Sequence, residues 1–141
     1  MVVVDDALLL DVLAGTAAPE LLEARRQGQV ATTGSWYWRA ARAVAGGGHG
    51  ALSRRVDALP STSQDLVRSG ADQLPPDIAL ISLRHLVPVM VRLPRPADLL
   101  TLEAVAVARL LNAQLLVSTT SSLLEELANS AGVSLRVAAS S

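Results

Sequence analysis

The N-terminal residues constrain the fold more than any other stretch of this 141-residue chain. Val2–Val4 are three consecutive β-branched residues, and they predict a short strand without a polar face. Such a strand is typical of the centre of a parallel sheet that helices cover on both sides. Asp5 and Asp6 follow directly, and an apolar run then predicts a helix that continues to Gly15. We therefore expect a buried central strand that ends in two carboxylates at a helix N-terminus.

Two interpretations of Asp5 and Asp6 are open. A carboxylate at a helix N-terminus accepts hydrogen bonds from free N–H groups and interacts favourably with the helix dipole. The carboxyl ends of the strands in an open α/β sheet are also where ligands bind. Capping alone explains one aspartate more easily than two, so we expect the pair to contribute to a site as well.

Composition and charge exclude several classes of protein. All 12 basic residues are arginine, and the 13 acidic residues leave a formal net charge of −1, so no strong global field attracts nucleic acid. The absence of cysteine excludes disulfides, thiolate chemistry and cysteine-based zinc sites. The two histidines, His49 and His85, lack metal-ligand spacing. No apolar run is long enough to span a bilayer and the N-terminus has no basic leader region, so we expect a cytoplasmic protein.

Short apolar segments alternate with helical segments along the rest of the chain. Four further strands are predicted, the last of them at a sheet edge: 29–32, 78–81, Gln114–Val117 and 133–137. The longest helix is predicted over 98–112, and a helix near Ser82 is expected to be interrupted by Pro88. This alternation is typical of parallel sheets with right-handed crossovers. We predict an α/β fold in a single domain, 1–141: a three-layer sandwich around a short parallel sheet with Val2–Val4 at its centre.

Residues that directly follow the strands of a parallel sheet share one rim, and hydroxyl groups are frequent there. The hydroxyl residues in question are Thr32, Thr33, Ser35, Ser82 and those within 118–122. Hydroxyls at helix starts are first of all caps, which is the interpretation we favour, with a phosphate or nucleotide site as an alternative. Glu103 lies near the start of the long helix and can reach the same rim. Glu103 lies between Leu102 and Ala104 in a largely apolar helix, so capping is a poor explanation for this acid. The alternative is that it is an acid near the helix N-terminus that the helix dipole favours.

The two ends of the chain resemble the PIN-domain family. The resemblance rests on the hydrophobic strand, aspartate and leucine-rich helix at the start, and on residues 100–120 and 123–133. Residues 46–76 contribute hardly anything to it. The family includes the VapC-type toxins of bacterial toxin–antitoxin pairs, which are metal-dependent endoribonucleases. The resemblance therefore implies a PIN-like fold, RNA as a substrate or ligand, and an antitoxin protein as a possible partner.

The family's site is a cluster of acids that holds a divalent ion, and its positions carry over to this sequence one by one. The first acid falls on Asp5 and the third on Glu103, so the resemblance implies that these two residues are catalytic. The place of the second acid holds Trp38 or Arg39, and the place of the fourth holds Thr120. The resemblance thus implies a degenerate site that keeps two of its acids.

The remaining acids allow one weakly bound ion. Asp5, Asp6 and Glu103 would hold Mg²⁺ or Mn²⁺, since magnesium needs only one or two carboxylates plus waters, whereas a two-metal clamp is not expected. Three further rim residues are candidates for binding: Arg39, Ser118 and Thr120. We favour a PIN-like protein whose catalysis is weak or lost and which acts by binding RNA or a protein. The alternative is an active Mg²⁺-dependent endoribonuclease toxin.

We also predict how these side chains meet. Asp5 and Glu103 should approach each other at the carboxyl end of the central strand, with Asp6 turned partly aside. Two carboxylates held close together repel, so one of them should have a raised pKa. Arg39 could relieve this repulsion by forming an ion pair where the family keeps a metal.

The only aromatic residues of the chain are consecutive, Trp36, Tyr37 and Trp38. On a helix they fan out too widely to face one core, so at least one should meet solvent or a partner. Stacking on RNA bases is one use, with Arg39 and Arg42 on phosphates. Core packing plus a dimer contact is the interpretation we favour. Together with the apolar run 86–90, it predicts a homodimer.

Overall fold

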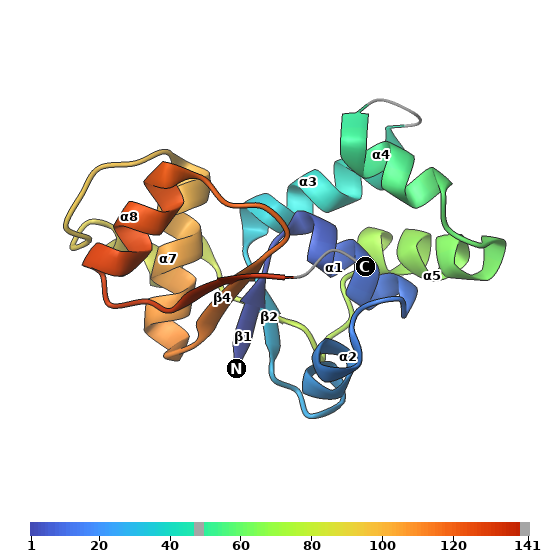
Figure 1. Cartoon of the computed structure of the whole chain (residues 1–141), viewed down its shortest axis with the longest axis horizontal. Helices are drawn as coiled ribbons and strands as arrows, with labels where there is room; N and C mark the ends of the chain where they lie inside the picture. Colours follow the sequence, from blue (N-terminus) through green and yellow to red (C-terminus); the bar gives the residue numbers. More distant parts are fainter. Residues whose placement is uncertain (47–49, 139–141) are drawn as a thin grey trace.

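The computed structural model describes residues 1–46 and 50–138. In this part of the chain, five parallel strands form one open sheet with helices on both of its faces (Figure 1). The strands are β1 Val2–Val4, β2 Val30–Thr32, β3 Ala79–Leu80, β4 Gln114–Val117 and β5 Leu135–Val137. Their spatial order is β3-β2-β1-β4-β5. The predicted α/β class, the parallel sheet, the central position of β1 and the edge position of the last strand are confirmed.

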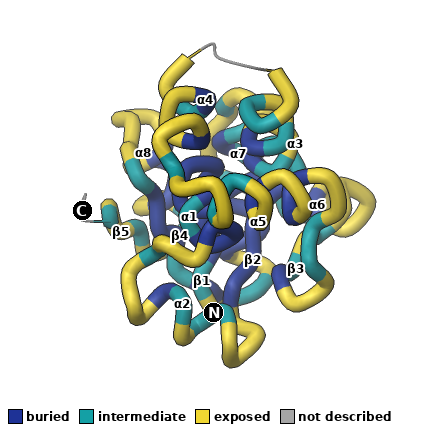
Figure 2. The backbone as a smooth tube through the Cα atoms, turned by 90° about the vertical axis from the view of Figure 1, so that its right-hand side faces the viewer, coloured by how far each residue is buried: buried dark blue, intermediate teal, exposed yellow. Residues whose placement is uncertain are grey.

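Helices form the two outer layers of the sandwich. Their bounds are α1 Asp6–Ala14, α2 Pro19–Arg26, α3 Gly34–Ala45, α4 Gly50–Asp57, α5 Ser61–Asp72, α6 Leu83–Met90, α7 Leu99–Leu111 and α8 Ser122–Ser130. One apolar core joins the sheet to α6, α7 and α8, and a second joins it to α1, α2, α4 and α5. Figure 2 shows the buried residues concentrated in the central strands, α1 and α7. The helix α3 contributes to both cores.

The valines of β1 explain why this strand has no polar face. Val3 belongs to the core under α7 and α8, whereas Val4 belongs to the core under α1, and both are fully buried. Successive side chains of a strand point to opposite faces, so a strand that helices cover on both sides needs apolar residues throughout. The register pairs Val3 with Ala31 of β2 and with Leu115 of β4.

Helices α1 and α7, which begin at the rim, each carry a side-chain cap. The Asp5 side chain caps α1, which ends at Gly15 with a left-handed φ of 76°. The Asp98 side chain caps α7, which ends at Asn112 with a φ of 51°. These caps place the N-termini of α1 and α7 at the carboxyl edge of the sheet, where the candidate residues lie.

The structure differs from the sequence prediction at Pro88. This residue lies inside α6, which continues to Met90 instead of being interrupted. Pro88 lacks the N–H that would bond to the Arg84 carbonyl, and α6 ends shortly afterwards at Met90. No helix in residues 1–46 or 50–138 is long and apolar enough to cross a membrane. His49, for which the sequence predicts no metal-ligand role, lies outside the described residues.

Candidate functional site

Asp5 lies where β1 ends and α1 begins, and both of its carboxylate oxygens accept hydrogen bonds. Oδ1 accepts a bond of 3.0 Å from the backbone N–H of Leu8, which caps α1. Oδ2 accepts two bonds of 2.7 Å from Ser118, one from its N–H and one from its hydroxyl. Ser118 directly follows β4, the strand that pairs with β1. Capping therefore accounts for one oxygen of Asp5, and a contact between two strands accounts for the other.

Asp6 is the first residue of α1 and is only 9% exposed. Its Oδ1 accepts a bond of 2.8 Å from the N–H of Ala7, and its Oδ2 lies 3.2 Å from Nε of Arg39 on α3. Burial, followed by the negative charge of Asp5, raises the pKa of Asp6, and the Ala7 N–H and Arg39 offset this only in part. The sequence leads us to expect a raised pKa and a pairing arginine at Asp5 or Glu103. The structure brings both features to Asp6.

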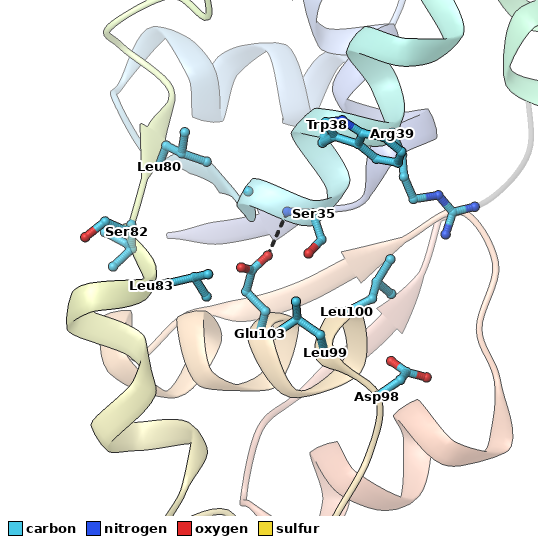
Figure 3. Close-up of a pocket in the computed structure, with 12 residues that line it drawn as sticks. Ser35, Trp38, Arg39, Leu80, Ser82, Leu83, Asp98, Leu99, Leu100 and Glu103 are labelled. Carbon is cyan, nitrogen blue, oxygen red and sulfur yellow. Dashed lines mark hydrogen bonds between the residues drawn. The ribbon is translucent and has the colours of Figure 1, made fainter.

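Glu103 lies in the second turn of α7 and is 2% exposed. Its Oε1 accepts a bond of 2.8 Å from the backbone N–H of Ser35 (Figure 3). Ser35 is in the first turn of α3, whose Trp36 N–H is bonded by the Thr33 side chain. The first N–H groups of a helix have no partner within the helix, and a carboxylate there also interacts favourably with the helix dipole. Glu103 thus caps a helix other than its own.

The three predicted metal ligands each contact a different partner. Asp5 accepts from Ser118, Asp6 pairs with Arg39, and Glu103 accepts from a backbone N–H. Among the residues that the structure describes, no three histidine, cysteine or acidic side chains are grouped so as to hold an ion. Both oxygens of Asp5 are occupied, and Asp6 has a cation beside it. As placed, this donor set does not fit a divalent metal.

The other predicted rim residues are placed as follows. Thr120 is exposed, and its hydroxyl donates a long bond of 3.5 Å to the backbone of Ser121, not to a carboxylate. Ser118, by contrast, is brought to Asp5 as part of the site. Thr33 caps α3, as the favoured interpretation of the hydroxyl residues predicts. That interpretation is wrong for two other residues: the Thr32 hydroxyl donates to the Val4 carbonyl at 2.8 Å, which links β2 to β1, and the Ser82 side chain makes no capping hydrogen bond to α6.

The sequence interpretation missed a second arginine–aspartate pair beside this site. Arg55 on α4 donates from Nε to Asp11 Oδ1 at 3.1 Å, and its Nη2 also contacts that carboxylate. The hydrogen bond to Asp11 raises the pKa of Arg55, and the charges of Asp5 and Asp6 add to the increase. The sequence contained a signal for this pair, because Asp11 interrupts the otherwise apolar run of α1. Arg39 and Arg55 therefore each pair with an aspartate of α1.

A cavity of about 650 Å³ opens beside Glu103, between α3, β3, α6 and α7. Its walls are mainly apolar, and among the side chains drawn in Figure 3 are Trp38, Leu80, Leu83, Leu99 and Leu100. Glu103 points into this space from α7. The sequence indicated several rim residues of the cavity but not its apolar walls, because these come from four separate elements.

The consecutive aromatic residues have three different environments. Trp36 is buried in the core, and the Tyr37 hydroxyl donates a bond of 2.9 Å to the Ala71 carbonyl. Trp38 is 59% exposed, with the Arg42 guanidinium 5.3 Å from its ring centroid. The prediction that at least one aromatic residue meets solvent is confirmed. In the run 86–90, Leu86 is fully buried in this chain's own core, whereas Val87 is exposed.

The chain matches no protein-family model, no curated protein and no solved structure. The chain is an α/β protein with an open, all-parallel five-stranded sheet in the part that the structure describes.

Proposed function

We propose that this chain is a PIN-like protein that has lost catalysis and acts by binding a macromolecular partner. The observation that carries the proposal is the ion pair between Arg39 and Asp6 at 3.2 Å. The resemblance implies an acid at or next to position 39, where the family's second carboxylate would help to hold a cation. This chain has a cation there, paired with a buried carboxylate.

Electrostatics explain why this replacement is incompatible with a metal-dependent nuclease. A divalent ion near Asp6 would have to displace the Arg39 guanidinium or tolerate its repulsion at short range. Such an ion would also compete with Ser118 for Asp5, which already accepts three hydrogen bonds. Magnesium needs free oxygen ligands in a near-octahedral arrangement, and these side chains offer few. The acidic residues then act as structural links between the sheet and the helices.

The surface next to this rim supports a binding role. Trp38 is exposed with Arg42 over its ring, and Leu83 and Leu99 are exposed beside it along the cavity. Tryptophan and arginine are enriched at protein interfaces, and aromatic rings also stack on RNA bases. The net charge of −1 favours a protein partner over RNA. A homodimer is the form that we propose to test first.

The catalytic part of the proposal is tested by incubating the purified protein with single-stranded and structured RNA in Mg²⁺ and in Mn²⁺. We expect no cleavage above that of an Asp5→Asn variant. The matched control is Asp72→Asn, which changes an exposed carboxylate at the end of α5. Metal-dependent cleavage that Asp5→Asn abolishes and Asp72→Asn preserves would establish the alternative, an active endoribonuclease.

The binding part is tested by sedimentation at micromolar concentration, with Trp38→Ala as the variant. We expect a dimer that Trp38→Ala weakens, because tryptophan is enriched among the few interface residues whose truncation costs about 2 kcal/mol or more. Leu110→Ala, which truncates an exposed side chain at the far end of α7, serves as the control. A monomer that binds RNA through Trp38 would instead identify RNA as the partner.

A further inference from the structure

Only one of the two carboxylate oxygens of Glu103 accepts a hydrogen bond from the described residues. Its Oε1 accepts from the Ser35 N–H at 2.8 Å, but its Oε2 accepts no hydrogen bond from the residues in 1–46 and 50–138 (Figure 3). Every fully enclosed side-chain oxygen or nitrogen in those residues has a partner, so Oε2 is open to the cavity. Glu103 is 2% exposed, so this oxygen has a small contact with a cavity that is itself open to solvent along Leu83 and Leu99.

The space around this oxygen has the size and character of a small-molecule site. The cavity of about 650 Å³ lies within the range of roughly 300–1,000 Å³ that is typical of ligand pockets. Leu80, Leu83, Leu99 and Leu100 form apolar walls, and Trp38 lies at one side. Apolar walls with a few convergent polar groups hold the body of a ligand by burial and fix its orientation by one polar contact.

The charges in the cavity favour a cation. Glu103 and Asp98 are the acidic residues of its lining, and Arg39 is the basic one. Arg39 is paired with Asp6 outside the cavity, and Figure 3 shows it extending away from Glu103. A buried carboxylate is unfavourable unless a partner compensates for its lost hydration. A cationic ligand would supply that partner, whereas an anion or a phosphate would be repelled.

The geometry also selects the kind of cation. A guanidinium binds best to both oxygens of a carboxylate, and one oxygen of Glu103 is occupied by the Ser35 N–H. A primary ammonium is a compact point charge with three separate N–H donors, so one of them can bond to a single carboxylate oxygen while the others stay hydrated on the open side of the cavity. A bare metal ion would find one free carboxylate oxygen and leucine walls, which do not provide its oxygen ligands.

We propose that this cavity binds a small organic primary ammonium, with the charged head on Glu103 Oε2 and an apolar body against the leucines. This site shares Trp38, Leu83 and Leu99 with the surface that we propose for the macromolecular partner, so the variants that test it change Glu103 and Gly34, which that partner surface does not use. It assigns to Glu103 the recognition of an organic cation in place of the metal that the resemblance implies.

The test titrates the protein with n-hexylammonium chloride, n-hexanol and sodium hexanoate, which share one apolar body and differ in their heads. Calorimetry and tryptophan fluorescence give the affinities. We expect the ammonium compound to bind at least about tenfold more tightly than the alcohol, because it adds a charge-assisted hydrogen bond. The carboxylate compound should bind more weakly than the alcohol. Equal affinities for the ammonium and the alcohol would overturn the proposal.

Two variants locate the site. Glu103→Gln should weaken hexylammonium at least about tenfold and leave hexanol unchanged. In Gly34→Ala the new methyl group would lie 3.7 Å from Oε2, which is an ordinary contact without a clash. The variant should therefore keep the fold. Because the methyl group covers this oxygen, it should weaken the binding of hexylammonium. Glu125→Gln, on the exposed side of α8, is the control. The proposal is wrong if both Gly34→Ala and a folded Glu103→Gln bind hexylammonium as tightly as the parent protein.

Discussion

Ser118 donates both its backbone N–H and its hydroxyl to one oxygen of Asp5, each at 2.7 Å, across 113 residues of sequence. This contact joins the end of β4 to the end of β1 and the start of α1. It uses the oxygen of Asp5 that does not cap the helix. A residue that the family resemblance presents as a metal ligand is therefore also a structural link between two adjacent strands.

Replacing Ser118 by alanine removes the hydroxyl bond and leaves the backbone bond. We expect the free energy of unfolding to fall by about 1.5–3 kcal/mol, the range for hydrogen bonds to charged groups. Urea denaturation measures this change. Ser130→Ala, at an exposed position in α8, should change stability by less than about 0.5 kcal/mol. A similar small change for Ser118→Ala would show that its hydroxyl does not stabilise the fold.

The raised pKa of Asp6 predicts the sign of a pH effect. Burial and the charge of Asp5 hold the folded-state pKa above the ordinary value of 3.8, so the native state binds the proton more tightly than the unfolded state. This contribution to stability is present below the ordinary pKa and is lost as pH rises through the folded-state pKa. The variant Asp6→Asn avoids that loss. Measured by urea denaturation, its stability relative to the parent protein should therefore increase between about pH 3.5 and pH 7.

Asp77 provides a control of opposite sign. Its hydrogen bond to Arg25 lowers the pKa of its carboxyl group, so its stabilising effect is present above the ordinary pKa and is lost as pH falls through the folded-state pKa. Asp77→Asn should thus lose stability relative to the parent protein as pH rises from below the folded-state pKa of Asp77 to about pH 5, a range that lies lower than the one for Asp6. This pair is exposed to solvent, so the effect should be small. Parallel trends for the two variants would contradict the assignment for Asp6.

Reversing the charge of Arg39 tests why the acidic cluster lacks a metal. In Arg39→Glu the pair with Asp6 becomes a repulsive contact, and we expect a loss of about 1–3 kcal/mol at neutral pH. Millimolar Mn²⁺ should recover part of this loss, because a cation again compensates the carboxylates. Thermal unfolding with and without Mn²⁺ measures both effects. The parent protein and Arg42→Glu should not respond, and stabilisation of the parent protein by Mn²⁺ would mean that the native site holds a metal.

Gly70 allows α5 to approach α1 closely. A Cβ at this position would lie 2.7 Å from Cδ2 of Leu13, a side chain that is buried in the core. We expect Gly70→Ala to destabilise the protein by about 1–3 kcal/mol through overpacking. Gly34→Ala is a matched control in another helix, where the nearest atom would be 3.7 Å away. If the two variants unfold at the same urea concentration, the packing of α5 on α1 is less close than described.

The sequence by itself determined the framework of this protein. Val2–Val4 could only be buried on both faces, and the alternation of apolar and helical segments required parallel strands joined by crossovers. The same local signals placed Asp5 and Glu103 at the rim. Side-chain period, caps and turn residues are properties of neighbouring residues, so they can be read without knowing which elements touch. Pro88 was misjudged because a proline removes one backbone hydrogen bond without necessarily ending the helix at that residue, and α6 continues to Met90.

Only the tertiary structure decided what the rim residues do. Arg39 pairs with Asp6, Ser118 bonds to Asp5, and Glu103 reaches a helix start 68 residues away. The cavity beside Glu103 is likewise formed by side chains from four separate elements. Each of these relationships depends on the distance and orientation between elements that are remote in sequence. Packing of whole layers sets those distances, and a local pattern of residues does not contain them.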